Sequence, residues 1–228
     1  MAEEKVQLDN QTTPKIAQIL STEHSTLQAA RSALVVEANG RTASFLNAIS
    51  AGVVALALVF NISEFGSIFL IFSMVLIPIL GFIGISAYVR MVQIDLAEYA
   101  YTSAINRIHH FYLQISPEIK PFISFPGFDD ERSISKARVI YTNLAWTVLS
   151  YPSGLILVIN SLLAGALFSL LVAILFRTQV WVAVGAGAVI FLMAAVLQYR
   201  LGLKWLTAVR EDFQPRFPEP ESSNPQKI

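Results

Sequence analysis

Four stretches of this 228-residue chain each run for at least 20 residues without an Asp, Glu, Lys, Arg or His side chain. A helix needs about 20 mostly apolar residues to cross the hydrocarbon core of a bilayer, because its backbone rises about 1.5 Å per residue. The sequence therefore predicts four membrane-spanning helices. They cover residues 43–62, 65–89, 153–176 and 180–199.

Very short links join these windows in pairs, so the spans are expected to form two helical hairpins. Composition agrees, since only 14% of the residues are charged, against roughly 25% in soluble chains. The predicted fold class is an all-α integral membrane protein with four transmembrane helices in two hairpins. The weaker alternative is a soluble protein built on two long buried hairpins.

The basic residues are distributed unevenly along the chain. Fifteen of the sixteen Lys and Arg residues lie before the first window, between the two hairpins or after the fourth window. Loops rich in Lys and Arg stay in the cytoplasm. We therefore expect a protein of the bacterial inner membrane with both termini and the central segment in the cytoplasm, and the two short links outside.

The first hairpin is expected to continue into the cytoplasm as a helical stalk. Residues 15–42 and 90–116 carry apolar residues at heptad spacing, which predicts helices that extend spans one and two. Matching the two helices by depth predicts a charge ladder, with Glu37 paired to Arg41 or Arg90 and Glu23 paired to Arg107. The ladder comprises Glu23, His24, Glu37, Arg41, Arg90, Arg107 and His109.

The remaining segments are expected to connect or flank these helices. Proline ends the second stalk helix, because it lacks the amide donor and disfavours helix in the residue before it. Asp130 or Ser133 is expected to cap the next helix. The predicted segments are a flexible N-terminus over 1–14, a loop over 117–130, an interfacial helix over 131–151, a juxtamembrane helix end over 200–213 and a disordered tail over 214–228.

Small and polar residues mark the second hairpin. Small residues four positions apart let helix backbones approach closely, so this stripe predicts either the packing seam of the hairpin or a subunit interface. Asn160 predicts either an interhelical hydrogen bond or a polar ring in an oligomeric pore. The packing or pore candidates are Asn160, Ser161, Gly165, Ser169, Ala183 and Gly187.

Two further features concern the shape and the outer ends of the spans. Pro78 with Gly81 and Gly84 is expected to kink the second span, as a structural bend or as a gating hinge. Glu64 and Arg177 are the charged residues of the two outer links and are expected to pair. An exposed pair of this kind stabilises by at most about 1 kcal/mol.

The sequence contains no pattern that indicates catalysis, a metal or a cofactor. The chain has no cysteine, which excludes thiolate chemistry and disulfides. Adjacent His109 and His110 project about 100° apart on a helix and do not converge on one ion.

The charges of the chain sum to zero, with sixteen acidic and sixteen basic residues, so no basic excess favours binding of nucleic acid. We expect a protein that is not an enzyme, with no catalytic residue, metal or cofactor.

Some stretches resemble a known group of proteins. The segment EHSTLQAARSALVVEANGRTASFL, with Glu23, His24, Arg31, Glu37, Arg41, Phe45 and Leu46, is similar to uncharacterised bacterial four-span membrane proteins. The resemblance continues through YVRMVQ, NRIHHFYLQISPE and the GFDD turn, over about residues 20–210. The layout also resembles SLATT-type transmembrane effectors of bacterial defence systems, although no nucleotide-sensing domain is evident.

These observations leave two classes of function open. The first is a non-enzymatic homo-oligomer, an ion channel or membrane-perturbing effector gated through the stalk. The alternative is a membrane-anchored regulatory or interaction protein, in which the stalk and the loop before Asp130 bind a cytosolic protein and nothing permeates. The lipid bilayer is the expected partner in either case.

Overall fold

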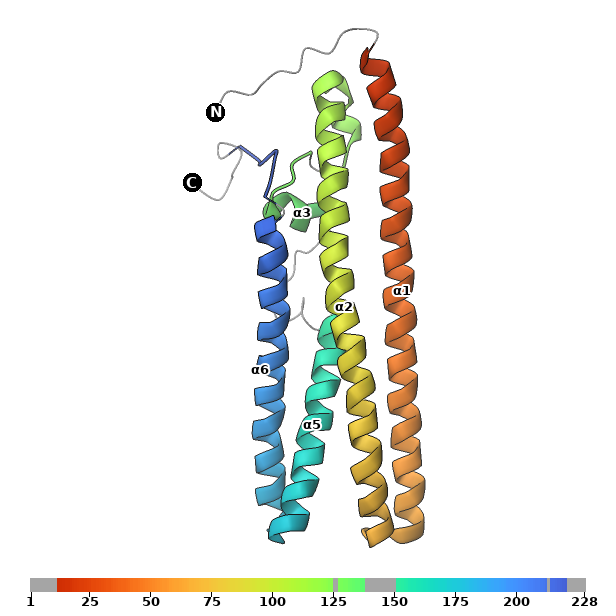
Figure 1. Cartoon of the computed structure of the whole chain (residues 1–228), viewed down its shortest axis with the longest axis vertical. Coiled ribbons are helices and arrows are strands. Elements are labelled where there is room, and N and C mark those ends of the chain that lie inside the picture. The colour runs from red at the N-terminus through yellow and green to blue at the C-terminus, as the bar shows by residue number, and fades with distance from the viewer. Residues whose placement is uncertain (1–11, 125–126, 138–150, 213, 221–228) are drawn as a thin grey trace. The chain divides into compact units, whose positions relative to one another are not determined.

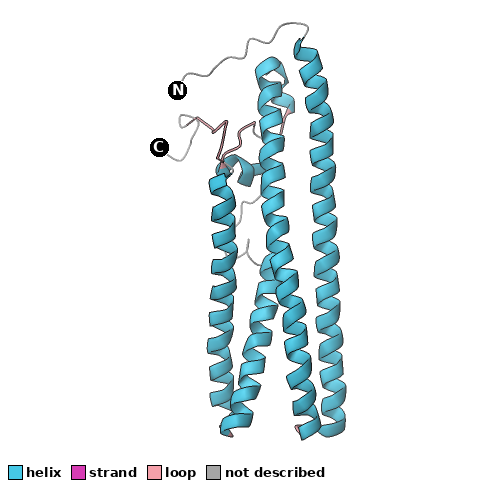
Figure 2. Cartoon of the chain, viewed as in Figure 1, coloured by secondary structure: helices cyan, strands magenta, loops and turns pink. Residues whose placement is uncertain are grey.

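The computed structural model describes residues 12–124, 127–137, 151–212 and 214–220. All regular elements in these residues are helices, and no strand is present among them (Figure 2). This confirms the all-α class that the apolar windows predict.

The first two helices are long and unbroken. α1 comprises Thr12–Ser63 and α2 comprises Ser67–Ile115 (Figure 1). The predicted cytosolic helices are therefore continuous with the spans that they adjoin. The N-terminal helix begins at Thr12, inside the segment that the sequence predicts to be flexible up to residue 14.

The second hairpin consists of α5, Pro152–Phe176, and α6, Val180–Asp212. Pro152 lies in the first turn of α5, where its missing amide removes no helical hydrogen bond. α5 ends where Arg177 adopts a left-handed conformation with φ 45°. The predicted helix end over 200–213 belongs to α6, up to Asp212.

Shorter elements lie between the two hairpins. A 3-10 helix, Pro117–Phe122, forms the start of the predicted loop. α3, Glu131–Ala137, forms the start of the predicted interfacial helix. The rest of that prediction, residues 138–150, lies outside the described residues.

The chain divides into two compact units. The tail unit comprises Met1–Leu34, Ala97–Tyr141 and Phe213–Ile228, and the span unit comprises Val35–Leu96 and Thr142–Asp212. α1 and α2 contribute to both units. All four apolar windows fall in the span unit.

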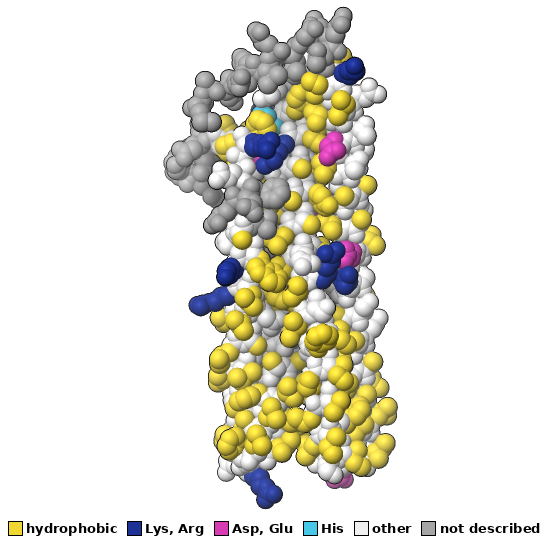
Figure 3. Space-filling model, viewed as in Figure 1, with side chains coloured by type: hydrophobic (Ala, Val, Ile, Leu, Met, Phe, Trp, Pro, Cys, Tyr) yellow, Lys and Arg dark blue, Asp and Glu magenta, His cyan; other side chains and the backbone are white. Residues whose placement is uncertain are grey.

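The surface of the span unit is predominantly apolar. Four helices are long and apolar enough to cross a membrane, and no more than 28% of the most apolar window of any of them is buried. Figure 3 shows apolar side chains covering the visible face of these helices. Helices that are apolar on all sides are typical of membrane spans, so the protein is a multi-pass membrane protein.

The interior of the span unit is built where helix backbones approach closely. Gly84 on α2 lies against Phe45 of α1 and Asn160 of α5. Gly165 of α5 lies against Gly187 of α6. The second pair confirms that the small-residue stripe is a packing seam within one chain.

Candidate functional site

Glu37 is the centre of a charged cluster in the span unit. Its Oε1 and Oε2 atoms accept hydrogen bonds from Arg90 Nε at 2.8 Å and Arg90 Nη2 at 2.9 Å. Arg41 Nε donates to Oε1 at 2.8 Å. The predicted pairs of Glu37 are therefore both present. The Arg90 and Arg41 hydrogen bonds lower the pKa of Glu37 from 4.5 to about 2.

The second predicted pair, Glu23 with Arg107, is wrong. Glu23 is exposed, and Arg107 Nε binds Asp129 Oδ2 at 2.6 Å. A different pair links α1 to α2 in the tail unit, since Arg31 Nη2 lies 3.1 Å from Glu98 Oε1. The predicted pairs assumed that residues at equal depth on α1 and α2 bind each other. Asp129 lies in the loop that follows α2, so this assumption did not include it as a partner of Arg107.

His24 and His109 meet between the same two helices. Their ring centroids lie 5.1 Å apart in an edge-to-face arrangement. His109 Nδ1 is buried and has no hydrogen-bond partner among the described residues. Burial, and then the charge of His24, lowers the pKa of His109.

Asp129 is a buried carboxylate of the tail unit that accepts three hydrogen bonds. Its side chain has no exposed surface. It accepts hydrogen bonds from the backbone N–H groups of Arg216 at 2.9 Å and Phe217 at 2.8 Å, in addition to Arg107. Its own N–H donates to the Phe217 carbonyl at 3.1 Å. Burial raises the pKa of Asp129, but the backbone donors and Arg107 outweigh it and hold this pKa below the usual range.

Residues 214–220, which we call the docked tail, are held at further points by side chains of the tail unit. The Phe217 ring stacks on His110 with centroids 4.3 Å apart and planes 17° from parallel. Asp130 Oδ1 accepts a hydrogen bond from the Glu219 N–H at 3.2 Å, and Lys136 Nζ lies 3.2 Å from Glu219 Oε2. The predicted disorder is therefore wrong for these seven residues; residues 221–228 lie outside the described residues.

The residues around the docked tail are themselves fixed by local hydrogen bonds. His110 Nδ1 donates to the Gly127 carbonyl at 2.9 Å. Asp130 Oδ2 accepts from the N–H groups of Arg132 at 3.1 Å and Ser133 at 3.3 Å. Of the two predicted caps, Asp130 is the one that caps α3. His110, Asp129, Asp130 and Lys136 thus form the surface that the docked tail contacts, and local hydrogen bonds fix His110 and Asp130 in place.

In the span unit the polar residues of the second hairpin bind one another. Asn160 Nδ2 donates to Gln198 Oε1 at 3.3 Å, and Gln198 Nε2 donates to Ser161 Oγ at 3.2 Å. Ser169 Oγ donates to the Ala183 carbonyl at 3.0 Å. Asn160 and Ser161 are buried. Asn160 therefore makes the interhelical hydrogen bond that was one of its two predicted roles. Sequence reasoning missed Gln198, although an uncharged polar side chain near the end of the 180–199 window is the signal that could have found it.

The three predicted kink residues have different surroundings. α2 continues without a break through Pro78. A Cβ atom on Gly84 would meet the Asn160 side chain and lie 2.9 Å from Phe45 Cε2, whereas one on Gly81 would meet nothing within 4 Å. Gly84 thus serves close helix packing.

The predicted pair of Glu64 and Arg177 is wrong. No ion pair joins these two residues in the described part of the span unit. Both are exposed, and each ends a helix in a left-handed conformation, with φ 49° at Glu64 and 45° at Arg177. Each charge instead faces solvent at its own turn.

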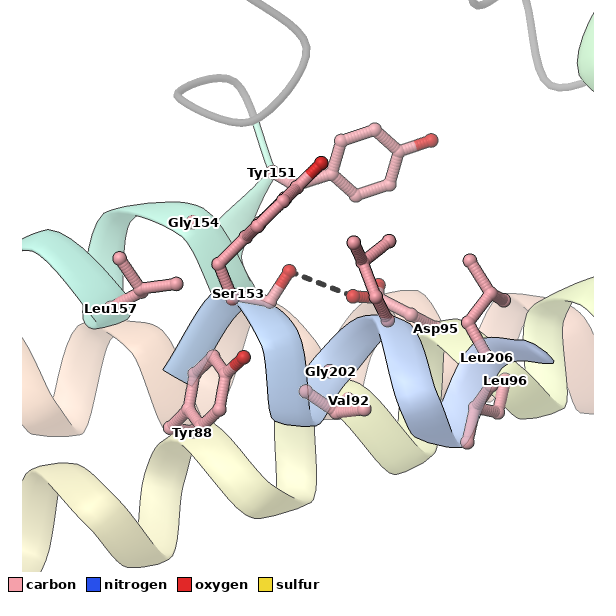
Figure 4. A pocket seen from close by; sticks show the side chains of 12 residues that line it. Tyr88, Val92, Asp95, Leu96, Tyr151, Ser153, Gly154, Leu157, Gly202 and Leu206 are labelled. Atoms are coloured by element: carbon pink, nitrogen blue, oxygen red, sulfur yellow. Dashed lines mark hydrogen bonds between the residues drawn. The ribbon is translucent and has the colours of Figure 1, made fainter. Parts of the chain in front are cut away.

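A cavity of about 180 Å³ lies between α2, α5 and α6 in the span unit (Figure 4). Leucines, a valine and glycines supply most of its wall, with the tyrosines at positions 88, 151 and 199. Ser153 Oγ donates a hydrogen bond to Asp95 Oδ2 at 2.7 Å within it. Sequence reasoning did not predict this cavity, because its lining residues are far apart along the chain.

The described residues contain no group of three His, Cys, Asp or Glu side chains that could hold a metal ion. Comparison with protein-family models, curated proteins and solved structures finds no match to this chain.

Proposed function

We propose that this chain is a membrane-anchored interaction protein whose tail unit binds a short peptide segment at the surface formed by His110, Asp129, Asp130 and Lys136. The four spans hold this surface at the bacterial inner membrane, on the cytoplasmic side where most Lys and Arg lie. The observation that carries the proposal is the docked tail, a segment with a bend at Arg216 and Phe217 that is already bound there.

The contacts resemble those of peptide recognition. Three backbone N–H groups of the docked tail, those of Arg216, Phe217 and Glu219, donate to carboxylates of the surface. Hydrogen bonds from the main chain of a peptide contribute affinity, and contacts with its side chains add specificity. Here the side-chain contacts select an aromatic residue and an acid two positions later, as at Phe217 and Glu219.

The docked tail lies at the outside of the tail unit, so a partner reaches the surface beneath it only by displacing the tail. Residues 214–218 are exposed even though they are bound, so their contacts are made at the rim of the unit. A tethered segment acts at an effective concentration in the millimolar range. A partner peptide therefore competes poorly unless the contacts of the tail are weakened.

The test uses the full chain with Phe217→Ala, which removes the stacking on His110. A labelled peptide of sequence QPRFPEP, residues 214–220, should bind this variant saturably in fluorescence anisotropy and bind the wild-type chain far more weakly. Adding Asp129→Asn should abolish the binding, whereas adding Glu118→Gln, at an exposed residue outside the surface, should not. A folded Phe217→Ala chain that does not bind the peptide would contradict the proposal.

An oligomeric channel gated through the stalk is the competing function. It is less well supported, because Asn160 and Ser161, which would line a pore, bind Gln198 inside one chain. Liposomes that contain the purified protein should show no ion flux under varied voltage and tension. Flux that increases with protein and changes in Glu37→Gln and Arg90→Gln variants would favour the channel instead.

A further inference from the structure

The Glu37 cluster of the span unit lies at the border of two apolar windows. Arg41 precedes the window that begins at residue 43, and Arg90 directly follows the window that ends at residue 89. Residues just beyond the ends of membrane spans lie at the level of the lipid headgroups. In a bilayer both arginines are therefore within reach of the phosphate groups of one leaflet.

The charges of this cluster do not cancel. It contains two guanidinium groups, those of Arg41 and Arg90, and one carboxylate, that of Glu37, so its net charge is +1. The hydrogen bonds from Arg90 and Arg41 hold the pKa of Glu37 at about 2, so this net charge does not change near neutral pH. A net positive charge next to a medium of low dielectric constant attracts an anion.

Arg41 has hydrogen-bond donors that the protein does not use. A guanidinium group carries five N–H donors. Arg41 Nε binds Glu37 Oε1 at 2.8 Å, and its two Nη atoms have no hydrogen-bond partner among the described residues. The side chain is 50% exposed. Both Nη groups are therefore available to a ligand from outside the protein.

The same carboxylate places Arg90 beside Arg41. The Nε atoms of both arginines donate to Glu37 Oε1, each at 2.8 Å, so the two guanidinium groups converge. Arg90 Nη2 donates to Glu37 Oε2 at 2.9 Å, and Arg90 Nη1 donates to Gln93 Oε1 at 3.2 Å. Each of these Nη atoms keeps a second N–H group. Glu37 is thus a positioning residue that holds donors from α1 and α2 together.

We propose that Arg41 and Arg90 bind the phosphate of an anionic phospholipid, the chemistry of phosphatidylglycerol. Planar guanidinium groups bind phosphate oxygens through pairs of parallel N–H donors. Basic sites between membrane helices are typical of binding to anionic headgroups. The single negative charge of this lipid neutralises the cluster, whereas a zwitterionic lipid adds a further positive charge to it.

The test is native mass spectrometry of the full-length protein in detergent with equal amounts of phosphatidylglycerol and phosphatidylcholine of the same acyl chains. The protein should retain phosphatidylglycerol preferentially. Arg41→Gln should reduce that preference by about fivefold or more, because it removes a basic residue that contacts the headgroup. Arg41→Lys keeps the charge but loses the planar donor pair, so it should also reduce the preference, to a smaller extent.

Arg200→Gln is the matched control. Arg200 is an exposed arginine that directly follows the window ending at residue 199, and it lies outside the cluster. This variant loses the same charge as Arg41→Gln and should keep the preference. Circular dichroism should show the same helix content in all variants, because the substituted side chains are exposed or half-exposed.

Three results would overturn the proposal. The first is equal retention of the two lipids by the wild-type protein. The second is an equal loss of preference in Arg41→Gln and Arg200→Gln, since overall charge rather than this cluster would then attract the lipid. The third is binding of free glycerol phosphate in calorimetry without retention of phosphatidylglycerol, since the ligand would then be a soluble phosphate.

Discussion

Single side chains in this protein owe their properties to the groups placed around them. Glu37 and Asp129 are both carboxylates held by arginine, yet only Asp129 also accepts backbone N–H groups. Sequence reasoning identified Glu37, whose partners lie four residues away and on the adjacent helix. It missed Asp129, whose partners come from α2 and from the far end of the chain.

The Glu37 pair allows a direct titration. The bidentate contact with Arg90 should keep Glu37 ionised well below the usual range, with a carboxyl midpoint of about 2. Carbon-13 NMR of labelled glutamate in detergent measures this midpoint. Arg90→Gln should raise the pKa toward 4.5, the ordinary value for Glu37. A midpoint that is the same in both proteins would show that the contact does not persist in solution.

His109 makes the stability of the tail unit depend on pH. Its pKa is lowered in the folded chain, whereas an unfolded histidine titrates near about 6.5. The unfolded chain therefore binds the proton first as pH falls, so the free energy of unfolding decreases below that pH. This decrease in the free energy of unfolding is complete once the pH is below the pKa of His109 in the folded chain.

The measurement is thermal unfolding in detergent at pH 7.5 and pH 5.5. The wild-type protein should lose more thermal stability between these values than His109→Gln does. His24→Gln should give an intermediate loss, because it removes the charge of His24 but keeps the burial of His109. Asp129 does not contribute in this window, since its lowered pKa places its titration further toward acid. Equal losses in wild type and His109→Gln would contradict the assignment.

At the scale of elements, the sequence predicted which segments form helices, but it did not predict which residues of neighbouring helices contact each other. Length and lack of charge are local properties, and they predicted the helix ends at the two hairpin turns closely: the windows ending at 62 and 176 match Ser63 and Phe176, and those beginning at 65 and 180 match Ser67 and Val180. The small-residue stripe indicated a close contact, but only the structure pairs Gly165 with Gly187. The docked tail was not predicted, because its proline-rich composition indicates that little apolar surface is buried. This segment is held instead by hydrogen bonds to carboxylates and by stacking of Phe217 on His110.

The α5–α6 seam gives a matched pair of glycine substitutions. In Gly187→Ala the new Cβ would meet Ser169 Oγ and lie 2.6 Å from the Gly165 carbonyl oxygen. Overpacking of this kind costs about 1–3 kcal/mol. Gly185→Ala, two residues away, meets nothing within 4 Å and should be neutral or slightly stabilising. Chemical unfolding in detergent compares the two, and equal stability would contradict a close seam.

For the whole molecule, the charge distribution leads to a topology that can be tested chemically. The sequence contains no cysteine, so any introduced cysteine is the single thiol of the chain. Glu64→Cys and Gln179→Cys lie in the two short links and should react with an impermeant maleimide added to intact cells. Glu118→Cys should react only after the membrane is permeabilised. Labelling of Glu118→Cys in intact cells would reverse the proposed orientation.

The two hairpin turns have a consequence for how the protein stays in place. Glu64 and Arg177 adopt left-handed backbone conformations that glycine would adopt without strain. Such strain costs of the order of 1–3 kcal/mol at each position. A glycine in either turn would remove that strain, but it would also remove a charge that resists entering hydrocarbon. In the proposed bilayer arrangement each charged turn therefore acts as a stop, which keeps its hairpin from sliding inward and sets the depth of the protein in the membrane.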